Sequence, residues 1–194
     1  MKGRKISFST VLTIFIVLFM GAYLYSARVK GWMIMGFMMI GFFKPDIPVV
    51  KPGEKLMPAP VMIVQGADGK ILDLQQQKGK VVFINFWATW CPPCLGELPS
   101  VNDLYLKVKD NPNIVFLTVD VDGKLARSSL FLQKKGYSFQ VYSRQNALPP
   151  EFFSGNIPTT LVIDKKGNVV FNHIERANYS DDQFAAYIIG LSKQ

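Results

Sequence analysis

The chain contains only two cysteines, Cys91 and Cys94, and they are separated by two prolines in the stretch FWATWCPPC. Two thiols at this spacing come close enough to form a disulfide if the segment opens a helix. Prolines are tolerated in a first helical turn, where backbone N–H groups lack partners anyway, so Pro92 and Pro93 are compatible with a helix that starts here. The spacing therefore predicts a thiol pair at the amino end of a helix.

This position suits redox chemistry. Unpaired N–H groups and the helix dipole stabilise a thiolate, and in such motifs the cysteine pKa falls from about 8.5 to roughly 3.5–7.5. Cys91 is the expected nucleophile. Cys94, one turn into the helix, is placed to attack a mixed disulfide on Cys91 and release the partner in its reduced form.

Three other uses of the pair are chemically conceivable. A structural disulfide across so short a loop would constrain the unfolded chain very little. A zinc site would need four ligands, and the sequence has no second cysteine pair and a lone histidine, His173. A copper-binding chaperone that uses Cys91, Cys94 and His173 stays open as the alternative function, because thiolates and imidazole suit copper.

The elements that would position the pair alternate between strand and helix. VVFINFWA (81–88) is a continuous apolar run, as expected of a central strand buried on both faces. A hairpin around the Asp-Gly turn of QGADG precedes it, and a capping signature at Ser180 and Gln183 starts the last helix. The other expected elements are helices over 92–109 and 124–136 and strands over 113–121, 139–143, 159–164 and 169–175. Residues 61–194 thus read as one α/β domain.

The first 60 residues have a different character. Residues 6–27 carry no charge and are long enough to cross a membrane as a helix, and Lys2, Arg4 and Lys5 precede them. We expect 1–30 to be an uncleaved signal anchor, since Tyr25 and Met20 spoil the small-residue cleavage pattern. Residues 31–43 read as an apolar interfacial segment rich in methionine, and a proline-rich linker extends to residue 60.

The net charge of +8 sits mainly in this amino-terminal part. Residues 1–60 hold eight Lys or Arg against two acids, whereas 61–194 hold fourteen against twelve. Basic residues beside an apolar segment are explained by membrane topology and anionic lipid, so no nucleic-acid partner is expected.

The segment VVFINFWATWCPPCLGELP (81–99), together with Ile157-Pro158-Thr159-Thr160 downstream, resembles the TlpA/ResA branch of the thioredoxin superfamily. The members of this branch are membrane-tethered, extracytoplasmic thiol-disulfide oxidoreductases of bacteria. The resemblance implies a thioredoxin-like α/β fold, with a central mixed sheet flanked by helices and the 61–74 hairpin added before the core. No metal, flavin or nucleotide cofactor is implied.

Four further site residues follow from this resemblance. Pro158 matches the cis-proline that lies beside the cysteines and helps to receive a substrate backbone. Glu97 matches an acid near the active site that would tune the thiols, although a helix-start glutamate has a plain structural explanation. Trp90 fits a contact surface beside the thiol, and Asn85 replaces the buried Asp of cytoplasmic thioredoxins.

The expected function is therefore reduction of protein disulfides on the periplasmic side of a bacterial inner membrane. Partners would be protein dithiol or disulfide clients, a membrane thiol electron donor, and the lipid bilayer through the anchor. By resemblance, the clients would be apocytochrome c thiols or copper-site cysteines.

Overall fold

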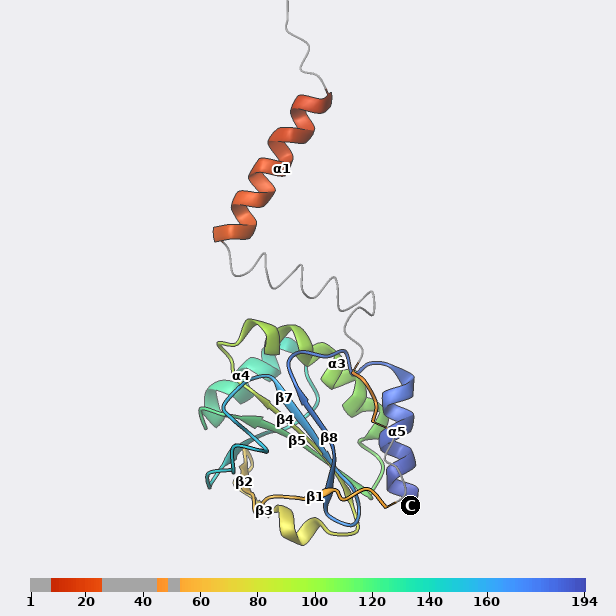
Figure 1. The fold of residues 1–194 in the computed structure, drawn as a ribbon. Helices are drawn as coiled ribbons and strands as arrows, with labels where there is room; N and C mark the ends of the chain where they lie inside the picture. The colour runs from red at the N-terminus through yellow and green to blue at the C-terminus, as the bar shows by residue number, and fades with distance from the viewer. Residues whose placement is uncertain (1–7, 26–44, 49–52) are drawn as a thin grey trace, which may run out of the picture.

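The computed structural model describes residues 8–25, 45–48 and 53–194 (Figure 1). The described helices are α1 (Phe8–Tyr25), α3 (Pro92–Val108), α4 (Leu125–Lys135) and α5 (Asp182–Lys193), and a 3₁₀ helix η1 covers Leu74–Gln77. The strands are β1 (Met57–Pro58), β2 (Ile63–Gly66), β3 (Ile71–Asp73), β4 (Val81–Trp87), β5 (Ile114–Asp120), β6 (Val141–Arg144), β7 (Thr159–Ile163) and β8 (Asn168–Ile174).

The eight strands form one mixed sheet in the order β1-β8-β7-β4-β5-β6-β2-β3. β4, β5 and β6 run parallel to one another, and the remaining pairs are antiparallel. A parallel pair needs a crossover connection, which α3 and α4 supply between these three strands. The mixed sheet flanked by helices that the sequence predicted is confirmed.

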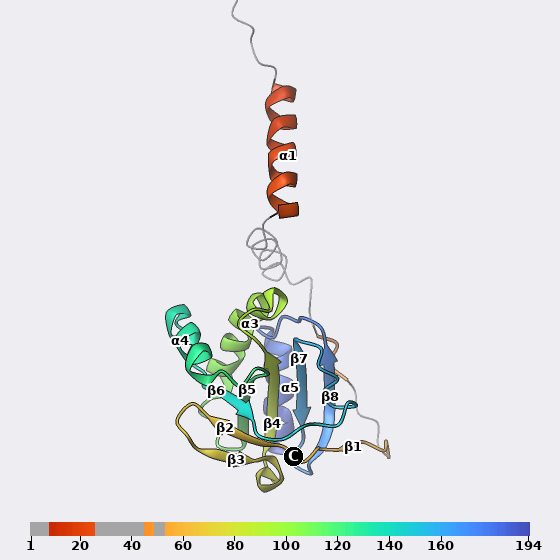
Figure 2. The same cartoon turned by 90° about the vertical axis from the view of Figure 1, so that its left-hand side faces the viewer.

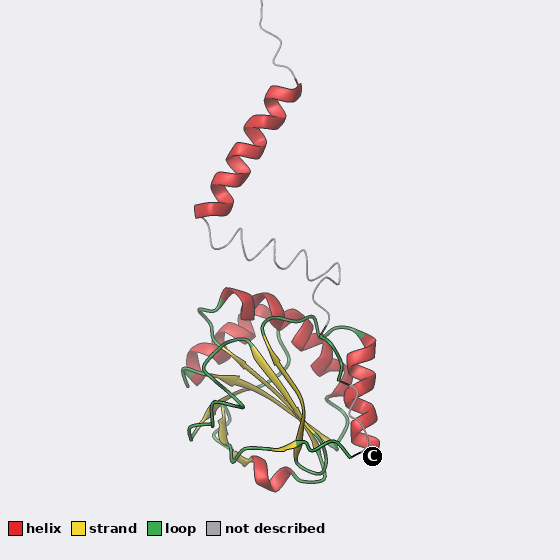
Figure 3. Cartoon of the chain, in the orientation of Figure 1, coloured by secondary structure: helices red, strands yellow, loops and turns green. Residues whose placement is uncertain are grey.

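The core is divided by β4, all seven of whose residues are buried. Successive side chains of a strand point to opposite faces. Phe83 and Trp87 therefore join the cluster that contains side chains of α3, α4 and α5. Ile84 and Phe86 join a second cluster on the other face, beneath the β2–β3 hairpin and η1. Figure 2 shows α5 behind β4 and β7, and Figure 3 shows the helices beside the central strands.

The predicted hairpin is also confirmed. β2 and β3 pair through Val64 and Leu72, and the turn between them contains Asp68 and Gly69. Gly69 has φ of 81°, a left-handed conformation that glycine adopts without steric cost. β2 then pairs with β6, so the hairpin extends the sheet at that side.

Two local features differ from expectation. Met57 and Pro58 lie in the segment predicted to be a linker, yet they form strand β1. This strand pairs with Val169 and Asn168 of β8. The N-cap of α5 is Asp181, whose carboxylate accepts from the Gln183 amide, so the predicted cap at Ser180 is wrong by one residue. Both residue types suit this position, but the Ser180 hydroxyl instead donates to Asn178 Oδ1 at 2.6 Å.

Most of the predictions for the amino-terminal part concern residues that lie outside the described ranges. α1 lies inside the expected anchor 6–27, whose two ends are outside the described residues. The apolar segment 31–43 lies wholly outside them. Among the helices that can be described, none is both long and apolar enough to span a membrane.

Candidate redox site

Cys91 and Cys94 stand at the point where β4 gives way to α3. Cys91 is the N-cap of α3 and the two prolines occupy the first positions of the helix, as predicted. The two sulfurs are joined in a disulfide. The Cys94 amide donates to Cys91 Sγ at 3.2 Å, so one of the unpaired N–H groups at the helix start is directed at this sulfur. A negative charge on Cys91 would be stabilised by the same group.

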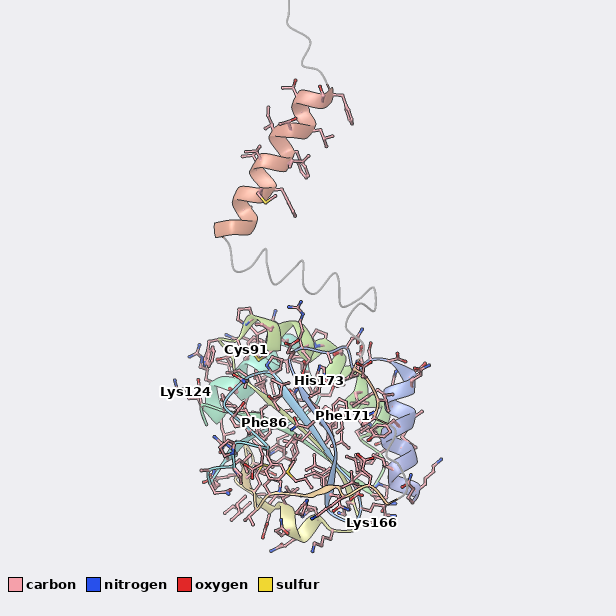
Figure 4. All side chains as sticks on the ribbon, viewed as in Figure 1. Phe86, Cys91, Lys124, Lys166, Phe171 and His173 are labelled. Atoms are coloured by element: carbon pink, nitrogen blue, oxygen red, sulfur yellow. A yellow bond between two sulfur atoms is a disulfide. The ribbon has the colours of Figure 1, made fainter. Side chains whose placement is uncertain are left out.

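The pair lies just beneath the surface. Cys91 is 3% exposed and Cys94 is 1% exposed, so both cysteines are buried in the oxidised protein. Figure 4 places Cys91 at the end of the domain opposite to Lys166 in the β7–β8 turn.

Pro158 lies beside the disulfide, as the resemblance implied. The Ile157–Pro158 peptide bond is cis. The Ile157 carbonyl oxygen lies 3.9 Å from Cys91 Sγ, and the Pro158 carbonyl accepts from the Glu175 amide at 3.0 Å. Strand β7 begins at the next residue, so the loop that carries this proline is fixed at one end by the sheet.

Glu97 is buried inside α3 and is 1% exposed. Oε1 accepts from Asn85 Nδ2 at 2.6 Å, and Oε2 accepts from the Ala177 amide at 2.9 Å. Burial raises the pKa of Glu97 from its ordinary value of 4.5 to about 8, and these two hydrogen bonds oppose part of that rise. The burial of Glu97 favours the interpretation as an acid that tunes the thiols. It does not fit a surface glutamate that only interacts with the helix dipole.

Residues three apart on a helix lie on the same face, so Glu97 and Cys94 are neighbours along α3. Asn85, buried in β4, also donates to Thr160 Oγ1 at 2.9 Å. The carboxyl group is therefore hydrogen-bonded directly to β4 and to the β8–α5 connection, and it is linked to β7 only through Asn85.

Trp90 is 58% exposed immediately before the nucleophile. Its Nε1 donates to Asp122 Oδ2 at 2.8 Å, and the Asp122 amide donates in turn to Asp120 Oδ1 at 3.0 Å. Asp120 is buried at the end of β5. The ring is thus held against the loop after β5 with much of its apolar surface free for contact.

His173 lies on β8, opposite Thr160 of β7, and its ring stacks on Phe171 with centroids 5.9 Å apart. Across the described residues, no group of three or more His, Cys, Asp or Glu side chains is placed to hold a metal ion. The ligand set of the copper alternative is therefore not assembled in this structure.

Sequence reasoning did not identify three members of the site: Ala177, Tyr179 and Asp122. Ala177 acts through its backbone amide, which no residue type reveals. Tyr179 comes six residues after His173 in a connection with no motif, yet it is fully buried. For Asp122, the only signal in the sequence is its place two residues after the end of β5.

Comparisons with known proteins agree with this geometry. The Redoxin family model matches residues 51–188. The thiol-disulfide oxidoreductase ResA of Bacillus thuringiensis is 34% identical over 137 residues, which cover 70% of this chain and 77% of that protein.

Two solved structures are also similar. A thiol:disulfide interchange protein of the thioredoxin family from Chlorobium tepidum has a TM-score of 0.57 and 27% identity, covering 72% of this chain and 98% of that one. The pneumococcal exposed lipoprotein thioredoxin of Streptococcus pneumoniae has a TM-score of 0.50 and 25% identity, covering 70% and 100%. This chain therefore belongs to the redoxin family, as a ResA-like thiol-disulfide oxidoreductase of the thioredoxin superfamily.

Proposed function

We propose that the protein reduces disulfides of extracytoplasmic client proteins while residues 6–27 anchor it in a bacterial inner membrane. The observation that carries the redox assignment is the Cys94 amide that donates to Cys91 Sγ at the start of α3. The anchor is supported by the uncharged sequence of 6–27 behind three basic residues. One of the similar structures is an exposed lipoprotein thioredoxin, which is consistent with a location of this protein's redox domain outside the cytoplasm.

The reaction begins with the reduced pair. The thiolate of Cys91 attacks one sulfur of the client disulfide, forms a mixed disulfide and releases the other client sulfur, which takes up a proton. Cys94 then gives its proton to a base, attacks Cys91 Sγ and releases the second client thiol. The client gains two electrons and two protons, and the pair ends as the Cys91–Cys94 disulfide. A membrane dithiol donor would restore the reduced pair.

The neighbouring residues have distinct roles in this scheme. Glu97 exchanges the proton of Cys94, because its carboxyl is buried on the same helix face. The cis-Pro158 loop and the Trp90 ring receive the client backbone beside Cys91. By family resemblance, the clients are apocytochrome c thiols or copper-site cysteines.

Turnover can be tested with the purified full-length chain in detergent, by following reduction of insulin disulfides with a dithiol as electron source. We expect loss of turnover in Cys91→Ser and accumulation of a mixed disulfide in Cys94→Ser. A potential near about −270 mV identifies a reductant, whereas one near about −120 mV identifies an oxidant. Stoichiometric Cu(I) binding without insulin reduction would favour the copper alternative.

Location needs a separate measurement. A reporter enzyme that is active only outside the cytoplasm, fused after Gln194, should be active in cells. Activity of a cytoplasmic reporter at the same position would contradict the proposed topology while leaving the thiol chemistry intact.

A further inference from the structure

The connection between β8 and α5, residues 175–181, begins beside the cis-Pro158 loop. The Glu175 amide donates to the Pro158 carbonyl oxygen at 3.0 Å. On the other side of the proline, the Ile157 carbonyl oxygen lies 3.9 Å from Cys91 Sγ. Two short contacts and a single residue therefore separate Glu175 from the sulfur that meets a client disulfide. A few extended client residues, at about 3.4 Å each, cover such a distance.

The backbone of Glu175 has an unusual conformation. Its φ is 110°, and among the residues that the structure describes it is the only one other than glycine with a positive φ. A residue with a Cβ atom is disfavoured in this region, whereas glycine adopts it freely. Strained residues of this kind cluster at functional sites. Glycine would suit the backbone better here, so the presence of a glutamate needs an explanation from its side chain.

The side chain of Glu175 has no structural partner. It is exposed, and within the described ranges its carboxylate makes no hydrogen bond or ion pair. The preceding residue, Ile174, is 48% exposed and pairs with Thr159, which directly follows Pro158. The surface beside the cis-proline thus carries an exposed apolar side chain and an unpaired negative charge. Such a surface complements a partner segment with apolar and cationic side chains.

The other acids beside the redox pair are already engaged. Both carboxyl oxygens of Glu97 are buried and accept hydrogen bonds. Asp122 Oδ2 accepts from Trp90 Nε1 at 2.8 Å and lies 4.0 Å from Lys124 Nζ. Of these three acids in the described part of the site, Glu175 is the one whose carboxylate is available to a client.

We propose that Glu175 is a specificity-determining residue of the redox site, whose carboxylate binds a cationic side chain close to the reactive cysteine of the client. This inference rests on the proposed reduction of client disulfides by Cys91. An ion pair at an exposed position contributes little free energy, so the carboxylate confers a preference of a few fold among clients and not an absolute requirement. A Lys or Arg beside the client disulfide is the feature that this preference recognises.

The test compares short synthetic peptides closed by an internal disulfide, in which each position beside a cysteine carries Lys or Gln in turn. The full-length chain in detergent reduces them with dithiothreitol as the electron source, and the uncatalysed rate is subtracted. We expect a position at which kcat/KM is about two- to fivefold higher with Lys than with Gln. This preference should disappear in Glu175→Gln, and Glu175→Lys should prefer Glu at the same position.

Asp110→Asn is the matched control. It also removes an exposed negative charge, but it does so beyond the far end of α3, whose 17 residues span about 25 Å. This variant should keep the preference for Lys. Equal rates with Lys and Gln at every position, or an equal loss of preference in Asp110→Asn, overturn the proposal and leave the reductase function intact. If the chain reduces none of the peptides, the proposed function fails as well.

A further variant tests the backbone strain at Glu175. Glu175→Gly should unfold at a higher urea concentration than the unsubstituted chain, because a φ of 110° suits glycine. The same variant should lose the preference for Lys. A lower urea midpoint overturns the proposal, because the glutamate would then be explained by its contribution to stability.

Discussion

The buried carboxyl of Glu97 predicts how the stability of the oxidised protein depends on pH. The folded state binds a proton there until about pH 8, whereas the unfolded chain releases it near 4.5. Stability from this group is therefore fully present below about pH 4.5 and falls as the pH rises toward 8. Replacing Glu97 by Gln, which has almost the same shape and no charge, should abolish this part of the pH dependence.

The size of the effect follows from the two pKa values. Each pH unit between them changes the free energy of unfolding by 1.36 kcal/mol per proton, so the whole span from 4.5 to about 8 corresponds to about 5 kcal/mol. At pH 7 the loss is about 3 kcal/mol. The amide of Gln cannot accept from both Asn85 and Ala177, and this adds a constant cost of roughly 1–3 kcal/mol at every pH.

The assay is urea unfolding of the oxidised chain at a series of pH values from 5 to 9, followed by tryptophan fluorescence. The free energy of unfolding of Glu97→Gln minus that of the unsubstituted chain should rise by about 3–4 kcal/mol between pH 5 and pH 8. Glu151→Gln is the control, because Glu151 is exposed. A difference for Glu97→Gln that is as flat as the control would refute the argument from burial.

Substitutions at three further positions test other parts of the structure. Trp90→Ala should slow insulin reduction about tenfold at an unchanged Cys91–Cys94 potential, because we propose that its exposed ring contacts the client. Equal turnover would contradict this role. Phe83→Ala should lower the free energy of unfolding, measured with urea, by about 3–5 kcal/mol, because its buried ring packs in a core cluster of aromatic side chains. A loss below about 1 kcal/mol would count against that packing. Gly136→Ala should cost about 1 kcal/mol in the same assay, because φ is 71° with no atom near the added methyl, and Gly136→Asn should cost less.

The sequence predicted the redox pair and its surroundings well, because the signals there are local. Two prolines after Cys91 and a continuous apolar run before it fix a strand followed directly by a helix start. Gly136 ends α4 in the left-handed conformation that its type predicts. These features depend on backbone preferences that each short segment carries by itself.

The parts that could not be predicted depend on contacts between distant segments. Asn85, Glu97 and Ala177 meet only once the sheet, α3 and the 175–181 connection have assembled. The sequence does not decide whether Glu97 is buried, since a position near a helix start explains the same residue type. β1 consists only of Met57 and Pro58. A segment of two residues has no strand periodicity, so its pairing with β8 cannot be predicted from the sequence.

Strand β1 has a practical consequence for anyone who shortens the chain. A fragment that begins at Val61, where the sequence places the domain boundary, would lack the two residues that cover Asn168 and Val169 of β8. That flank of the sheet would then present free backbone groups to a second molecule, and unprotected strand edges promote self-association. A soluble version that retains Met57 and Pro58 should stay monodisperse at concentrations where the shorter one aggregates.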